Sequence, residues 1–153
     1  MKNRVYWIFA GLLMAAIFAV SGIPDLSLYD SAKLPPDWLI WISNHTIRFG
    51  KSGFFSYMVS PHPDYVLHKL GHIFAFGFLG ISLYLAAGRS PKRGVLLTAI
   101  FAASDELHQF FVAGRSSRLA DIILDVCAAI LFIGLFKGCR RLTGKERAES
   151  TEG

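Results

Sequence analysis

Residues 103–125, ASDELHQFFVAGRSSRLADIILD, decide the fold of this chain because they place charged side chains between two apolar segments. A helix of 20 residues is about 30 Å long, which matches the thickness of a hydrocarbon core. Segment 94–113 therefore spans a membrane only if its polar residues lie inside the helix. The ionisable residues of the stretch are Asp105, Glu106, His108, Arg115, Arg118, Asp121 and Asp125.

The composition predicts a membrane protein of one domain, residues 1–153. Hydrophobic residues make up 53% of the 153 positions and charged residues only 18%, which is unusual for a soluble protein. Apolar segments at 5–23, 70–87, 94–113 and 119–136 predict four transmembrane helices, and a polar tail is expected at 143–153. A cleaved signal peptide is the alternative for the first segment, but its apolar run exceeds the usual ~7 to 15 residues.

The long link between the first two predicted spans contains a candidate surface helix. PPDWLIWISNHTIRFG, residues 35–50, places Trp38, Trp41 and Ile42 at helical spacing, and indole rings favour the lipid headgroup zone. We therefore predict an amphipathic helix on the outer membrane surface. SPHPDYV, residues 60–66, is expected to be extended because of its two prolines. His45 and His62 are assigned to the outer loop surface without a role.

Basic residues predict the orientation. Ten of the sixteen Lys and Arg flank the ends of the predicted spans on one side, at positions 2, 4, 89, 92, 93, 137, 140, 141, 145 and 147. The positive-inside rule then places both termini in the cytoplasm of a multi-pass plasma-membrane protein. The net charge of +5 is explained by this cytoplasmic fringe, so no nucleic acid partner is expected.

Helical spacing predicts that the polar side chains meet in the outer leaflet. Lys69 and His72 are three residues apart, Asp105 precedes His108 and Gln109 by three and four, and Asp121 precedes Asp125 by four. At the helical rise, Asp105 lies about 12 Å from the outer end of its segment. The link VAGRSSR is short, so the last two spans are antiparallel neighbours with Arg115 and Arg118 above the carboxylates. The predicted binding residues are Lys69, His72, Asp105, Glu106, His108, Gln109, Arg115, Arg118, Asp121 and Asp125.

Three interpretations of this cluster remain open. Intramembrane charges usually mark a functional site, and paired arginines suit an anionic headgroup, so a binding pocket is the leading one. Catalysis is the second, with Glu106, His108, Asp105 and His72 as candidate acids or bases. In the third, the charges only lock the helices together. No ligand pair at metal spacing occurs, so no metal is predicted, and the residues indicate no particular cofactor or oligomeric state.

Three motifs together resemble the VanZ-like family of small bacterial membrane proteins. HKLGHIFAFGFLG at 68–80 fits K-x-x-H at the head of a helix, SDELHQFFVAGRS at 104–116 fits S-D-E-x-H-Q followed by G-R-S, and RLADIILD at 118–125 fits D-x-x-x-D. The resemblance covers residues 66–135. It implies a membrane setting, and the family is named after a protein associated with low-level resistance to the glycopeptide teicoplanin. The expected partner of the polar pocket is a membrane lipid or cell-wall precursor headgroup, and an effect on teicoplanin susceptibility would follow from that binding.

Overall fold

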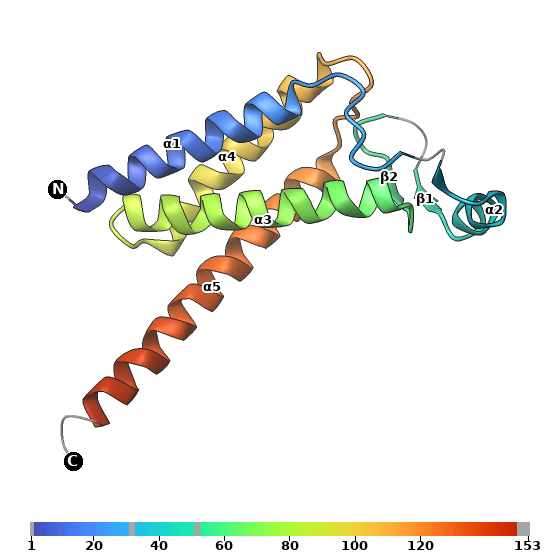
Figure 1. Ribbon diagram of the computed structural model, residues 1–153. Coiled ribbons are helices and arrows are strands. Elements are labelled where there is room, and N and C mark those ends of the chain that lie inside the picture. Colours follow the sequence, from blue (N-terminus) through green and yellow to red (C-terminus); the bar gives the residue numbers. More distant parts are fainter. Residues whose placement is uncertain (1, 31–32, 51–52, 150–153) are drawn as a thin grey trace.

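The computed structural model describes residues 2–30, 33–50 and 53–149, and within these ranges it contains five helices and one hairpin (Figure 1). Four long helices pack together, and the hairpin with a short helix lies at one end of them, opposite the two chain ends. The mostly helical fold confirms the predicted class in its main feature. The elements are α1 (Lys2–Ser21), α2 (Pro36–Asn44), β1 (Ile47–Phe49), β2 (Tyr57–Val59), α3 (Pro63–Ala86), α4 (Pro91–Phe110) and α5 (Leu119–Glu149).

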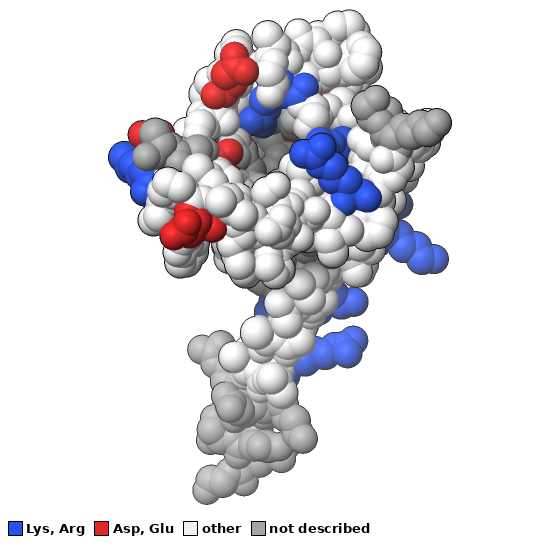
Figure 2. Space-filling model, turned by 90° about the vertical axis from the view of Figure 1, so that its right-hand side faces the viewer, with Lys and Arg blue, Asp and Glu red and all other residues white. Residues whose placement is uncertain are grey.

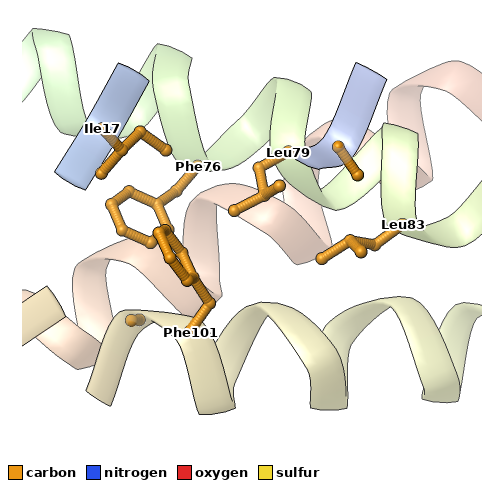
Figure 3. Packing of buried hydrophobic residues seen from close by; sticks show 7 residues of the cluster. Ile17, Phe76, Leu79, Leu83 and Phe101 are labelled. Atoms are coloured by element: carbon orange, nitrogen blue, oxygen red, sulfur yellow. The ribbon is translucent and has the colours of Figure 1, made fainter. Parts of the chain in front are cut away.

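The buried apolar core joins α1, α3 and α4. Phe76 of α3 packs on Phe101 of α4 with 5.9 Å between ring centroids, and Ile17 of α1 reaches the same cluster (Figure 3). Leu79 and Leu83 extend it along α3. Many other apolar side chains point outward, among them Leu12 at 64% exposure and Ile100 at 59%. An apolar exterior of this kind is expected of helices surrounded by lipid tails.

Small residues allow α3 and α5 to approach closely. A Cβ atom added to Gly80 would lie 2.7 Å from the Cβ of Ala129 and 3.0 Å from its Cα. Both Ala128 and Ala129 are buried on the facing side of α5. Close backbone contact through Gly and Ala is typical of helix pairs in membranes, because association there depends on packing rather than on hydrophobic burial.

Three of the described helices are long and apolar enough to cross a membrane, namely α1, α3 and α5. The fourth predicted span corresponds to α4, which has the length of α1 but carries polar residues in its last two turns. The structure therefore supports a membrane protein with three apolar spans among the described residues. The same polar residues, Asp105, Glu106 and Gln109, are buried inside the helix bundle.

Two helix starts differ from the predicted ones. We expected the second span to begin at Leu70, but α3 begins at Pro63, and residues 63–66 are helical rather than extended. His62 caps α3 by accepting a hydrogen bond from the backbone N–H of Asp64 at 3.2 Å, and proline is well suited to the first helical position. For the same reason α4 begins at Pro91 after its cap Ser90, three residues before the predicted start, and it ends at Phe110 instead of 113.

The predicted ends of the first and last spans also need correction. The predicted first span was 5–23, whereas α1 runs from Lys2 to Ser21. The helix α5 continues past residue 136 to Glu149, because residues 137–149 are mostly good helix formers joined to an existing helix. The predicted polar tail is thus helical up to Glu149, and its last residues, 150–153, lie outside the described part of the chain.

The segment predicted as one surface helix contains a helix and a strand. The helix α2 ends at Asn44, and residues 47–49 form β1, which pairs antiparallel with β2 so that Arg48 lies opposite Met58. Strands of three residues are too short to produce a readable alternation of polar and apolar positions. The hairpin was therefore not predicted, and it brings Arg48 to the end of the bundle where α3 begins.

Candidate functional site

A polar cavity lies at the hairpin end of the bundle. Its volume is about 430 Å³, and its walls come from the hairpin, the first turns of α3, the α4–α5 link and the start of α5. Figure 2 views this end of the molecule and shows Lys and Arg side chains around a hollow. The polar lining residues include Arg48, His62, Asp64, His68, Lys69, His72, Gln109, Arg115, Arg118 and Asp121.

Backbone and side-chain hydrogen bonds fix the hairpin over this cavity. The Tyr65 hydroxyl of α3 donates to the carbonyl of Met58 at 2.5 Å, and the N–H of Leu119 donates to the carbonyl of Phe54 at 3.0 Å. The hairpin is thus joined both to α3 and to the first residue of α5. These bonds position Arg48 on the same cavity as the α4–α5 link.

Gly114 makes the tight turn of that link possible. Its φ is +72°, a conformation that residues with a side chain rarely adopt. A Cβ atom at this position would also collide with the side chain of Asp25. The turn places the next residue, Arg115, in the cavity wall.

Two pairs join α3 to α5 at the cavity. Lys69 forms an ion pair and hydrogen bond with Asp121. One turn deeper, Nδ1 of His72 lies 3.2 Å from Oδ1 of Asp125. Asp125 is fully buried and Asp121 is 8% exposed, so each carboxylate has a partner that offsets part of its desolvation cost.

A third cluster joins α1 to α4. Oδ2 of Asp105 accepts hydrogen bonds from Ser21 Oγ at 3.0 Å and from Gln109 Nε2 at 2.8 Å. All three residues are buried, with Asp105 at 0% exposure. The i, i+4 spacing of Asp105 and Gln109 is what the sequence predicted, but the contribution of Ser21 from α1 was missed because α1 is otherwise apolar.

Glu106 is buried beside the start of α5. Its Oε2 accepts a hydrogen bond from the backbone N–H of Arg118 at 2.8 Å, immediately before the first residue of the helix. A carboxylate at a helix N-terminus satisfies a free donor and interacts favourably with the helix dipole. This contact holds the start of α5, where the third motif (residues 118–125) begins, close to Glu106 of the second motif (residues 104–116).

His108 faces α1 rather than the cavity. Its ring stacks on Phe18 with 3.9 Å between centroids, and its Nε2 would lie 3.1 Å from a Cβ at Gly22. It does not line the polar cavity. In the described part of the chain, His108 Nε2 is one of four buried side-chain atoms without a hydrogen-bond partner, and the others are Asp105 Oδ1, Glu106 Oε1 and Arg115 Nε.

The arginines of the cavity have no anionic partner in the described structure. Its three ion pairs use Asp64, Asp121 and Asp125, and none includes an arginine. The two acidic residues of the cavity wall are already engaged. Asp121 pairs with Lys69, as described above, and Asp64 accepts hydrogen bonds from three groups of residues 27–29 at 2.5 to 3.3 Å. The guanidinium groups of Arg48, Arg115 and Arg118 are therefore left to bind another anion.

The structure divides the predicted binding residues into two groups. Of the ten, the cavity wall includes Lys69, His72, Gln109, Arg115, Arg118 and Asp121, while Asp105, Glu106, His108 and Asp125 do not line it. Among the four catalytic candidates, only His72 lines the cavity.

Sequence reasoning missed several residues of the cavity wall. Arg48 was placed on a helix, and His62 was given no role although it caps α3. Asp64 and His68 were missed because residues 63–69 were expected outside any helix. Their i, i+4 spacing was the sequence signal that could have predicted a contact between them. In the structure His68 Nε2 lies 3.5 Å from Asp64 Oδ2. Lys69 alone of that turn was recognised, through its spacing to His72.

The described residues contain no group of three or more His, Cys, Asp or Glu side chains arranged to hold a metal ion. Cys127 and Cys139 are both free and exposed on α5. Basic side chains and imidazoles outnumber the two carboxylates in the cavity wall, and basic side chains suit an anionic ligand.

The sequence matches the family model described as VanZ/LLP1 over residues 6–141. The match includes all three motifs of residues 68–125 and confirms the resemblance drawn from them. It also extends the resemblance to α1 and to the α2–hairpin segment. No curated protein and no solved structure matches the sequence.

Proposed function

Since this chain belongs to the VanZ/LLP1 family, we propose that it is a multi-pass plasma-membrane protein whose outward-facing polar cavity binds an anionic cell-envelope ligand. The ligand is a lipid or wall-precursor headgroup. The observation that carries this proposal is the group of three arginines without anionic partners, which line a cavity of about 430 Å³. Forked guanidinium donors match the oxygens of phosphate or carboxylate.

The polar residues of α4 are buried inside the bundle, which supports α4 as a fourth transmembrane helix. Asp105 and Glu106 point into the bundle, while Leu96, Ile100 and Leu107 are each about 60% exposed on the outside. A helix with a polar inside and an apolar outside is suited to lipid, although its average hydropathy is low. With α4 included, an even number of spans places both termini on one side, and the basic residues favour the cytoplasm.

The contacts between helices favour a second, structural role for the polar cluster, in which some of its side chains hold the helices together. Lys69–Asp121 and His72–Asp125 connect α3 to α5, and Ser21–Asp105 connects α1 to α4. We assign these pairs to holding the helices, which leaves the arginines for the ligand. The lock and the binding site then use different members of one polar cluster.

Catalysis on an envelope lipid is the alternative from another class. A general base must lie within hydrogen-bond reach of its substrate, but Glu106 and His108 do not line the cavity. His72 does line it, but its Nδ1 is already paired with Asp125. Binding is therefore the preferred function. An effect on teicoplanin susceptibility would follow from sequestering or presenting an envelope component, and mass spectrometry of lipids from cells with and without the protein tests the alternative, because an enzyme would change the lipid profile.

The binding proposal is tested by the lipids that remain on the protein after purification in mild detergent. We expect anionic lipids on the wild type and a loss of about tenfold or more in the Arg115→Gln/Arg118→Gln variant, because charge-assisted hydrogen bonds contribute about 1.5 to 3 kcal/mol each. Arg93→Gln is the control, since Arg93 is exposed at the opposite end of α4. Equal lipid content in all three proteins would contradict the proposal.

A further inference from the structure

An apolar groove lies beside the polar cavity, between α1 and α3. Its volume is about 250 Å³. Most of its wall is hydrocarbon, supplied by both helices and by the segment that follows α1. The lining residues include Leu13, Ala16, Ile17 and Val20 of α1, Leu28 of the following segment, and Ala75 and Phe76 of α3.

The groove and the polar cavity share part of their walls. Leu26, His68, His72 and Arg115 line both of them. His68 is fixed in this position because its Nε2 lies 3.1 Å from the carbonyl oxygen of Leu26. The two spaces therefore adjoin, with imidazoles and a guanidinium at the boundary between the polar and the apolar part.

Arg115 is the charged residue at that boundary. It also lines a third cavity of about 770 Å³ under the hairpin, together with Arg48 and Arg118. Its Nε is buried and has no hydrogen-bond partner among the described residues. A buried donor without a partner is costly, so an anion placed against Arg115 would satisfy it. Such an anion would then lie at the end of the apolar groove.

The position of the groove suits entry from the bilayer. It includes Ser21 at the end of α1 and His68 in the second turn of α3, so it reaches the hairpin end of two candidate membrane spans. A free phosphate ion would use only the polar part of the site. A lipid with a phosphate headgroup would use both parts, because its chain fits an apolar groove and its charge fits the arginines.

We propose that the polar cavity and the α1–α3 groove form one site for a phosphate-bearing membrane lipid. The phosphate contacts Arg115, and the apolar chain lies between α1 and α3. This inference rests on the proposed binding function and adds the class of ligand and the place of its chain. It makes Ala16 a specificity-determining residue, because its small side chain leaves the groove open.

The test measures binding of methyl, butyl and octyl phosphate to the full-length protein in detergent. It compares the wild type with Ala16→Phe, which fills the groove, and with Ala15→Phe as the matched control. Both alanines are exposed on α1, but only Ala16 lines the groove. Thermal unfolding verifies that each variant is folded, and Ala16→Leu replaces Ala16→Phe if the latter fails this check.

We expect affinity to rise with chain length in the wild type and in Ala15→Phe, by about tenfold or more between methyl and octyl phosphate, and to stay flat in the variant at position 16. An equal rise in all three proteins would overturn the placement of the chain, since it would reflect partition into the micelle. In that case phosphate binding, and with it the proposed function, would still stand. Absence of binding by every phosphate, including inorganic phosphate, would overturn both proposals.

Discussion

His72 and Asp125 lie face to face across the α3–α5 interface, with 3.2 Å between Nδ1 and Oδ1. Asp125 is fully buried, and the side chain of His72 is 18% exposed. The pair lies one helical turn below Lys69 and Asp121, so two consecutive turns of α3 are joined to α5 by polar contacts. Each partner stabilises the burial of the other, and loss of one leaves the second without compensation.

Asp125→Ala leaves the largely buried imidazole of His72 without its acceptor and is expected to lower the free energy of unfolding by about 1 to 3 kcal/mol. Thermal unfolding in detergent measures the change. Ile123→Ala is the control on the same helix, because Ile123 is 56% exposed and packs little. Equal stability of the two variants would show that the pair does not hold α3 to α5.

Ser21 provides the corresponding test for α1 and α4. Ser21→Ala removes one of two donors to the buried Asp105 and is expected to cost about 1 kcal/mol. Ser82→Ala is the matched control, because the Ser82 hydroxyl donates only to the carbonyl of Phe78 in its own helix. A larger effect of Ser82→Ala in the same unfolding measurement would contradict the role given to Ser21.

Close packing of α3 on α5 predicts a strong effect of one added methyl group. In Gly80→Ala the new Cβ would lie 2.7 Å from the Ala129 Cβ, so the helices must separate, and overpacking typically costs about 1 to 3 kcal/mol. Gly71→Ala on the same helix has no atom within 4 Å of its new Cβ. We expect Gly71→Ala to unfold at or above the wild-type temperature, since alanine favours helix more than glycine does.

The pairing of helices was predictable from the sequence where helical spacing was informative. Asp105 with Gln109, and Asp121 with Asp125, share a face at i, i+4 whatever surrounds them. The short VAGRSSR link also made α4 and α5 neighbours by necessity. Contacts between distant segments were different: nothing in an apolar helix indicates that Ser21 reaches Asp105, 84 positions away.

Other errors came from prolines and short strands. Pro63 follows a capping residue and begins α3, whereas the same residue type in a loop would favour an extended chain. Whether Pro63 begins a helix or continues an extended chain depends on whether the His62 side chain accepts a hydrogen bond from the backbone N–H of Asp64. That contact forms only in the folded chain. The hairpin strands contain three residues each, so their pairing depends on contacts such as Tyr65 with Met58 and not on local pattern.

Orientation is tested by labelling in intact cells with a membrane-impermeant maleimide. In a background where Cys127 and Cys139 are replaced by serine, Phe55→Cys places a thiol on the hairpin and Lys92→Cys places one at the start of α4. Both positions are exposed. We expect labelling of the Phe55→Cys variant in intact cells and of the Lys92→Cys variant only after permeabilisation. The reverse pattern would place the cavity on the cytoplasmic side.

The central claim is that the arginines of the cavity bind an anion while the buried pairs hold the helices. Thermal unfolding with and without glycerol 3-phosphate tests whether the arginines bind an anion and do not themselves hold the helices, because a ligand stabilises only the state that binds it. Without ligand, we predict that Arg115→Gln/Arg118→Gln unfolds at or above the wild-type temperature, because the buried Nε of Arg115 has no partner to lose. With ligand, the temperature should rise in the wild type alone. An equal rise in both proteins, or a variant that is already less stable without ligand, would contradict the account.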